Sequence, residues 1–231
     1  GASFGTGVGI STIMKGGLYG GGSGGASNQT ANGGVSDGIE GSDGAVRIVW
    51  GYNRSFPQNN TATGESGEPE VGSAEWTTSG SYSWTCPANV TSVCAVCIGG
   101  GGSGSVAENS SSGGGGGGGG LGYKNYISVT PGQSYTVNVG GDSYFIDVNT
   151  VKGSRGLNAD QSGSSGFTGG TGGGYVGDGG GTGGTGGNSD GTDGGGGGGA
   201  GGYSGNGGNG APGYVQGSNS GSDGSGGGGG G

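Results

Sequence analysis

Glycine is the feature that most constrains how this chain can fold. It supplies 78 of the 231 residues, and ordering each glycine costs about 0.5–1 kcal/mol more than ordering an alanine. Only five prolines occur, so the strict Gly-X-Y repeat of collagen, with its abundant proline, is excluded. Any ordered structure must offset the lost glycine entropy through lateral backbone hydrogen bonds and close packing.

The remaining composition separates a disordered chain from an all-β one. Apolar residues make up 26% of the sequence, a fraction typical of low-complexity disorder. Charged residues are only 9%, however, and the apolar residues gather in short β-branched and aromatic runs. No window shows the 3.6-residue period of a helix, which so much glycine also disfavours. We therefore expect an all-β fold with essentially no α-helix.

Short alternating runs mark the expected strands. Tyr82, Trp84 and Cys86 share one face of an extended stretch, and 92–99 is nearly continuous in apolar residues, as in a strand buried on both faces. PANVT (87–91) reads as a hairpin, and 123–129 and 134–139 read as a second hairpin around the turn dipeptide Pro131-Gly132. The predicted antiparallel strands are 81–98, 123–129, 134–139 and 143–151, with GAVRIVWG (44–51) as a further strand. They predict small antiparallel β-sandwich modules.

The long glycine segments predict a second kind of structure. From residue 171 to 213 every third position is glycine, serine or threonine. This period suits polyglycine II, a left-handed helix like polyproline II with three residues per turn and about 3.1 Å per residue, which must hydrogen-bond to its neighbours. We expect residues 169–213 to be ordered in a polyglycine II bundle. The alternative is a flexible linker.

Composition also divides the chain into three parts. Residues 1–57 are a glycine-rich segment with a closing strand. Residues 58–75 are polar, contain Pro69 and lack a period, so they read as a linker. Residues 76–231 combine the β core with glycine-rich segments.

Five stretches carry a resemblance to known proteins. They are SYSWTCPANVTSVCAVCIGGGGSG (81–104), GGGGLGYKNYISVTPGQSYTVNVGG (117–141), GGGYVGDGGGTGGTGG (172–187), GGGGAGGYSGNGGNG (196–210) and SDGAVRIVWGYNRSFP (42–57). Together they resemble the glycine-rich domain of structural and tail-fibre proteins of tailed phages, notably phages of cyanobacteria. Polyglycine II bundles are also a feature of some phage tail-fibre adhesins.

The order of the pieces differs from that family, in which the AVRIxWG strand and RSFP exit close the domain. Here they come first, which suggests one repeat of a longer array, with Gly231 of one unit next to Gly1 of another. The resemblance then implies an assembly strand, completing the sheet of a neighbouring unit. It comprises Ala45, Val46, Arg47, Ile48, Val49 and Trp50.

Catalytic and metal chemistry find little support. Histidine is absent, which removes the commonest general base and metal ligand. Cys94 and Cys97 have CxxC spacing, but a zinc site needs four ligands, and residues three apart in a strand point to opposite faces. We expect no enzyme, no cofactor and no metal. The three cysteines are core thiols, or Cys86 and Cys94 form a disulfide.

Surface residues leave further alternatives open. Asp178, Asp190, Asp193 and Asp223 are solvated acids or a calcium site. The tyrosines plug gaps between helices or line a sugar-binding surface; they are Tyr19, Tyr52, Tyr123, Tyr126, Tyr175, Tyr203 and Tyr214. Possible glycosylation sequons begin at Asn28, Asn53, Asn59, Asn89 and Asn109.

A structural function follows. We expect an extracellular or virion fibre subunit that assembles head to tail with itself by strand sharing. A phage receptor-binding adhesin that contacts a host receptor or glycan is the alternative, and an ice- or glycan-binding surface protein the third. With six Lys plus Arg and a net charge of −9, nucleic-acid binding is not expected. No apolar run approaches the roughly 20 residues of a membrane span.

Overall fold

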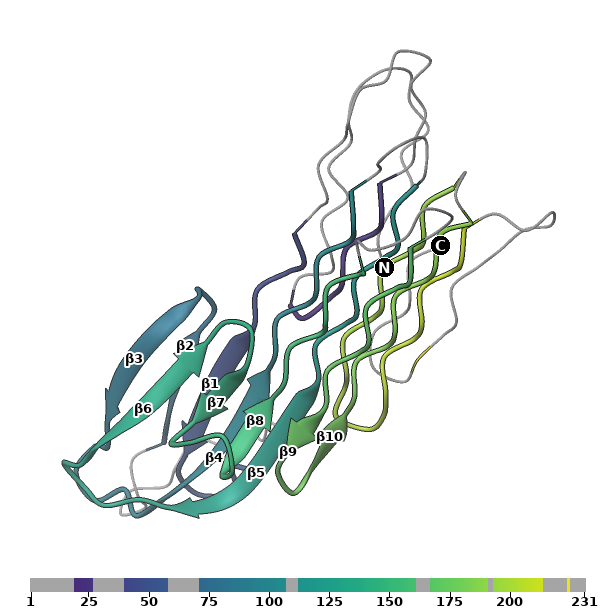
Figure 1. Cartoon of the computed structure of the whole chain (residues 1–231). Helices are drawn as coiled ribbons and strands as arrows, with labels where there is room; N and C mark the ends of the chain where they lie inside the picture. Colours follow the sequence, from purple (N-terminus) through teal and green to yellow (C-terminus); the bar gives the residue numbers. More distant parts are fainter. Residues whose placement is uncertain are drawn as a thin grey trace.

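The protein is built from two stacked β-sheets that continue into a bundle of extended glycine segments (Figure 1). The computed structural model describes residues 19–26, 40–57, 71–106, 112–160, 167–190, 193–213 and Gly224. Ten strands form two five-stranded sheets in which every pairing is antiparallel. No α-helix occurs among these residues. The expected all-β fold is confirmed.

The strands are distributed over the two sheets as follows. The first sheet has the order β10-β5-β4-β1-β2 and the second β3-β6-β7-β8-β9. The bounds are β1 Ala45–Trp50, β2 Gly72–Trp76, β3 Gly80–Thr85, β4 Ser92–Ile98, β5 Leu121–Ser128, β6 Ser134–Val139, β7 Ser143–Phe145, β8 Val151–Gly153, β9 Tyr175–Val176 and β10 Gly179–Gly181. Consecutive strands β2 and β3 lie at one edge of the two sheets, and β9 and β10 at the other.

The sandwich core lies between the sheets. Ile48 of β1 and Cys97 of β4 are fully buried against Phe145 of β7. Trp84 of β3 lies 5.6 Å from Trp50 and 5.8 Å from Phe145, ring centre to ring centre. Burying each large apolar side chain contributes about 1.5–3 kcal/mol. This cluster explains why the alternating runs of the sequence form sheets.

The Pro131-Gly132 turn is confirmed. Gly132 has a φ of 77°, which is the left-handed conformation that the third residue of a type II turn requires. The backbone amide of Gln133 donates to the Thr130 carbonyl at 3.1 Å, closing the turn between β5 and β6. The predicted second hairpin is nevertheless wrong, because β5 and β6 belong to different sheets.

Two strand predictions need correction. The expected strand 143–151 is divided into β7 and β8 by a tight turn at Asp147. Its carboxylate Oδ1 accepts hydrogen bonds from the backbone amides of Asn149 and Thr150 at 2.8 and 2.9 Å, so the chain reverses within the predicted strand. Residues 87–91 do not form a hairpin, because β3 and β4 belong to different sheets. The segment instead carries the chain from one sheet to the other.

The predicted linker and the predicted assembly strand also differ from the structure. Residues 72–75, assigned to the linker 58–75, form β2 together with Trp76. Ala45–Trp50, expected to complete a neighbouring unit, pairs with both β4 and β2 of its own chain. Its alternating apolar residues bury Val46 and Ile48 in the core, and Val49 on the opposite face. The sheet is therefore complete within one chain, and the described parts of 1–57 and 76–231 share one sandwich.

The glycine bundle as the candidate functional site

The glycine bundle consists of eight extended segments lying side by side (Figure 1). They are 20–26, 99–105, 112–120, 154–160, 167–174, 182–190, 194–201 and 206–213. Several of them continue strands directly: 99–105 follows β4, 112–120 leads into β5, and 154–160 follows β8. The sandwich therefore sets the starting position of each segment.

Segment 112–120 lies at the centre of the bundle and is called the rod. Its backbone amides donate to three different segments, with three-residue spacing, at 2.6–2.9 Å. Gly113, Gly116 and Gly119 donate to Ala26, Ser23 and Gly20; Gly115 and Gly118 to Gly187 and Gly184; and Gly117 and Gly120 to Leu157 and Ser154. Successive residues thus point in three directions.

The carbonyls of the rod bind three further segments with the same spacing. Gly113, Gly116 and Gly119 accept from Gly195, Gly198 and Gly201; Gly114, Gly117 and Gly120 from Ser105, Gly102 and Gly99; and Gly115 and Gly118 from Gly170 and Gly173. The rod therefore has six hydrogen-bonded neighbours, and all of residues 112–120 are buried.

The six neighbours also bond to one another and close a ring. Representative amide-to-carbonyl bonds run from Ser23 to Gly102, Gly156 to Gly100, Leu157 to Thr171, Gly186 to Gly170, Gly184 to Gly199 and Gly22 to Gly198. The segment 206–213 binds outside this ring, where Gly207 and Gly210 donate to Thr182 and Thr185. The three-residue spacing and lateral bonding are those that polyglycine II requires. The left-handed sense of the segments stays a prediction.

The rod is glycine because its neighbours leave no room for a Cβ atom. A Cβ on Gly116 would overlap the Gly102 carbonyl group, and one on Gly118 the Gly199 carbonyl group. The same restriction holds in the surrounding segments, where a Cβ on Gly22 would overlap the Gly116 carbonyl group and one on Gly207 the Gly199 carbonyl group; Gly24 is an exception. The nearest atom to a Cβ on Gly24 is the Gly195 carbonyl oxygen at 3.7 Å, an ordinary contact distance.

Buried serines fit the bundle by replacing a carbonyl acceptor. Ser23 and Ser105 are fully buried. Their Oγ atoms accept from the backbone amides of Gly104 at 2.7 Å and Gly114 at 2.8 Å. Because a buried amide without a partner is costly, these hydroxyls maintain the bonding where no carbonyl reaches.

Asparagines cap the outward amides of the bundle. Asn206 and Asn209 accept through Oδ1 from the amides of Thr182 and Thr185 at 3.0 and 2.9 Å. Asn188 accepts in the same way from Gly169 at 2.9 Å, and Asn158 from Ser103 at 3.0 Å. Each cap lies on the neighbouring segment. The paired spacing of Asn206 and Asn209 is visible in the sequence, but its role depends on which segments become neighbours.

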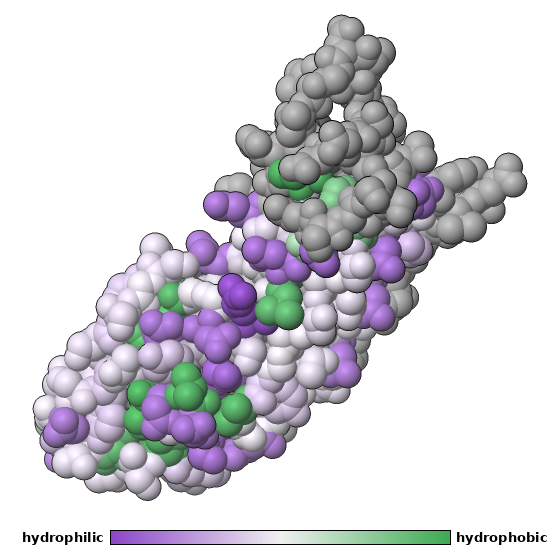
Figure 2. Space-filling model, in the orientation of Figure 1, coloured by the Kyte–Doolittle hydropathy of each residue, from purple (hydrophilic) through white to green (hydrophobic). Residues whose placement is uncertain are grey.

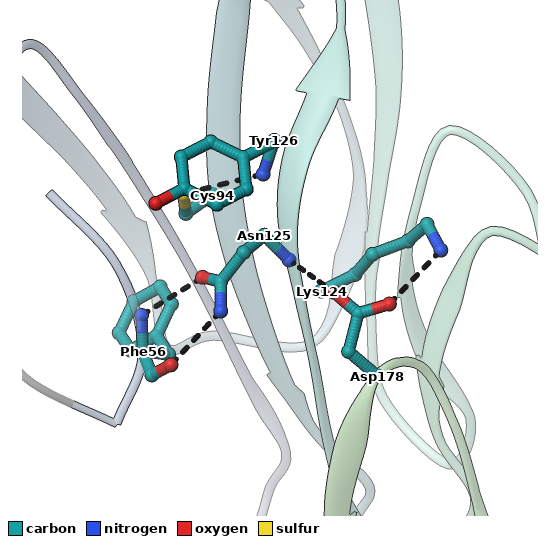
Figure 3. A network of polar contacts seen from close by, with 6 residues as sticks. All are labelled: Phe56, Cys94, Lys124, Asn125, Tyr126 and Asp178. Atoms are coloured by element: carbon teal, nitrogen blue, oxygen red, sulfur yellow. Dashed lines mark hydrogen bonds and ion pairs between the residues drawn. The ribbon is translucent and has the colours of Figure 1, made fainter.

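Asn125 of β5 fastens two segments to the first sheet, the one that follows β1 and the turn between β9 and β10 (Figure 3). Its side chain accepts from the Phe56 amide at 2.8 Å and donates to the Phe56 carbonyl at 2.9 Å. Its own amide donates to Asp178 at 2.9 Å, and Lys124 lies 3.2 Å from the same carboxylate. The Asn125 amide first, and Lys124 second, hold the pKa of Asp178 below its usual range.

Aromatic side chains pack where the turn between segments 194–201 and 206–213 meets the first sheet. The rings of Phe56 and Tyr203 stack with their centres 5.9 Å apart and an interplanar angle of 10°. Tyr203 in turn lies 5.9 Å from Tyr123. These two tyrosines plug a gap where the bundle meets the sandwich. Tyr52, Tyr126 and Tyr175 are exposed instead, Tyr19 is half-buried, and Tyr214 lies outside the described residues.

The three cysteines are buried free thiols. Of the two alternatives for these residues, the structure has the buried thiols and not the Cys86–Cys94 bridge: Cys86 lies in the core between the sheets, whereas Cys94 faces the other side of its sheet. Cys97 packs in the core, so Cys94 and Cys97 lie on opposite faces as predicted. Burial raises the pKa of all three thiols, most strongly for Cys97.

The remaining predicted surface residues are scattered. Asn53 and Asn89 are exposed in turns with φ of 55° and 65°, while Asn28, Asn59 and Asn109 lie outside the described residues, as does Asp223. Asp190 accepts from the Asp193 amide at 2.8 Å. Within the described ranges no three His, Cys, Asp or Glu side chains are grouped to hold a metal ion.

The described surface of the bundle is mostly of intermediate hydropathy. Figure 2 shows a mostly pale face over its described part, broken by isolated polar and apolar residues. The described segments include no helix of the length and apolarity that a membrane crossing needs. Comparisons with protein-family models, curated proteins and solved structures find no match.

Proposed function

We propose that this chain is a non-enzymatic structural module of an extracellular or virion fibre, with the glycine bundle as its stiff part. The observation that carries the proposal is the closed ring of six segments around a buried rod. A rod bonded in six directions cannot bend without straining lateral bonds on several sides. Each such bond contributes about 1 kcal/mol, and the bundle contains many of them.

The chemistry of the bundle suits exposure outside a cell. The rod carries no titratable side chain, so its hydrogen bonds do not depend on pH. A protease must bind an extended stretch of backbone, and in the rod every backbone direction is already occupied by a neighbour. Stiffness and protease resistance are properties that a fibre module needs. Strand sharing through β1 is no longer part of the proposal, because β1 lies inside its own sheet.

A receptor-binding adhesin is a second candidate, favoured by one observation. Ala26, Ser105 and Gly113 meet in one hydrogen-bonded layer, and Gly195 joins it. This layer is at the end of the bundle away from the sandwich (Figure 1). Several described segments thus begin or end at the same end of the bundle, which is a favourable arrangement for presenting residues to a partner.

Limited proteolysis with electron microscopy tests the structural proposal. Negative-stain class averages should show an elongated particle with a fixed angle between sandwich and bundle. Thermolysin should leave the bundle intact under conditions that degrade a glycine-rich peptide. Cleavage of the bundle at peptide rates would contradict the proposal. Saturable binding of labelled chain to intact cells, competed by unlabelled chain, would support the adhesin.

A further inference from the structure

Within the part of the chain that the structure describes, one of the four edge strands of the sandwich is unprotected. β9 has two residues, β10 is three glycines, and β2 carries Glu75, all features that discourage pairing with another strand. β3 has six residues, Gly80–Thr85, with no charge and no proline. In Figure 1 it forms the outer edge of its sheet.

The free edge of β3 presents three residues to solvent. The Cys86 amide donates to the Gln133 carbonyl, and the Cys86 carbonyl accepts from Gly132, both at 2.9 Å, so the backbone of Cys86 faces β6. Backbone groups alternate in direction along an antiparallel strand. Trp84 and Tyr82 therefore also face β6, and the backbones of Ser81, Ser83 and Thr85 face outward.

The side chains of these residues suit a second strand. Ser81, Ser83 and Thr85 are exposed and lie opposite Asn138, Thr136 and Ser134 of β6. Thr85 Oγ1 and Ser134 Oγ are already hydrogen-bonded at 3.0 Å. Such cross-strand hydroxyl pairs stabilise antiparallel sheets, and an added strand with the same residues would continue the ladder.

Charge also permits two copies to meet here. The chain has a net charge of −9, which opposes association in general. Residues 77–86 and 130–141, which form β3, β6 and their flanks, contain no Asp, Glu, Lys or Arg. Two copies can therefore pair along β3 without placing charged residues of β3 or β6 in contact; Asp43 lies just beyond this stretch, where it accepts from Ser79 Oγ at 2.8 Å.

We propose that β3 pairs with β3 of a second copy of this chain, antiparallel, about a two-fold axis at Ser83. Ser83 faces its own counterpart, and Ser81 faces Thr85 in both directions. The three outward residues then exchange both backbone bonds with their partners, as hydrogen-bonded pairs do, and the two sheets become one. The interface is self-complementary, as two-fold symmetry requires. This inference depends on the edge alone and stands apart from the proposed fibre function.

Sedimentation equilibrium of the full chain, from micromolar to millimolar concentration, tests the pairing. The mass should rise with concentration from 21.2 kDa to twice that value, more readily at high salt because the net charge is screened. Ser83→Lys places two like charges together at the axis and should weaken dimerisation at least tenfold. Ser83→Pro removes an outward amide, which an edge strand tolerates, and should act in the same way.

Thr136→Lys is the matched control, because it adds the same charge to the same exposed face one strand away from the edge. It should leave dimerisation within about twofold, as substitutions away from a shared contact normally do. A chain that stays monomeric throughout, or a dimer that both Ser83 variants leave unchanged, overturns the proposal. Circular dichroism and melting of each variant show whether a loss reflects the edge or the fold. If either Ser83 variant retains wild-type melting and dimerises as wild type, the pairing is excluded.

Discussion

The sandwich and the bundle stabilise the same chain in opposite ways. In the sandwich, Ile48, Trp84 and Phe145 exclude water with large side chains, and backbone bonding follows the strands. In the bundle, the rod has no side chain beyond Ser112, and the backbone bonds in six directions. A chain poor in apolar residues can therefore concentrate them in the sandwich. In the bundle, the lack of side chains lets backbone segments approach closely enough to hydrogen-bond.

The difference also concerns what each region tolerates. A sandwich core accepts changes in apolar side chains if their volume is retained. The rod accepts no added atom, because carbonyl groups already occupy the Cβ positions of Gly116 and Gly118. We therefore expect the free energy of unfolding to be most sensitive to the removal of atoms in the sandwich and to the addition of atoms in the rod.

Removing atoms should have its largest effect in the sandwich. Phe145→Ala leaves a cavity at a fully buried ring that contacts Trp84 and Tyr135. We expect unfolding free energy to fall by about 3–5 kcal/mol, measured by chemical denaturation. A loss below about 1 kcal/mol, the size typical of an average substitution, would show that the sandwich core is not what supports this region.

Adding atoms should affect the rod next most strongly. Gly116→Ala is expected to cost about 1–3 kcal/mol through overpacking. Gly24→Ala, in a ring segment but at a position where a Cβ makes only an ordinary contact, should be neutral or stabilise by about 0.4–1 kcal/mol through reduced unfolded-state entropy. Denaturation curves compare the two. Equal losses at both positions would contradict the six-sided packing of the rod.

The asparagine caps should contribute less. Asn209→Ala removes the acceptor of the Thr185 amide, at an expected cost of about 0.5–1.5 kcal/mol. Amide exchange at Thr185 should accelerate by about tenfold or less, while exchange at Gly184, which donates to Gly199, stays unchanged. Unaltered exchange at Thr185 would remove the capping role.

The smallest effect concerns pH. It distinguishes Asp178, which titrates, from the rod, which has no titratable side chain. Because the folded-state pKa of Asp178 is lowered, its contribution to stability is complete above the unfolded pKa of about 3.9. It is lost as pH falls through the lower folded value. In an acid titration, wild type should be more stable than Asp178→Asn above about pH 4–5, and this difference should disappear as pH falls further. A difference that persists unchanged at pH 2 would exclude this linkage.

Much of the sandwich can be predicted from sequence, because its strands alternate locally. The turn at Pro131-Gly132 follows from residue type alone. The division at Asp147 does not, because it depends on a carboxylate that bonds two later amides. The place of β1 also escaped prediction, because strand partners are set by the whole sheet and the family order suggested a neighbouring unit.

The bundle is predictable in its period but not in its arrangement. Small residues at every third position indicate lateral bonding. Which of the several glycine runs becomes the rod depends on which other segments surround it in the fold. The eight consecutive glycines 113–120 offer a signal in retrospect, since only an uninterrupted run can bond on six sides. Asn125, which fastens Phe56 across 69 residues of sequence, has no local signal.

Amide hydrogen exchange of residues 113–120 tests most directly whether a side-chain-free rod is held by its six neighbours. If it is, these amides exchange as slowly as those of β1 and β4 in the sandwich, and Gly116→Ala accelerates them while Gly24→Ala does not. Exchange of the whole stretch at the rate of a free glycine peptide would contradict the bundle.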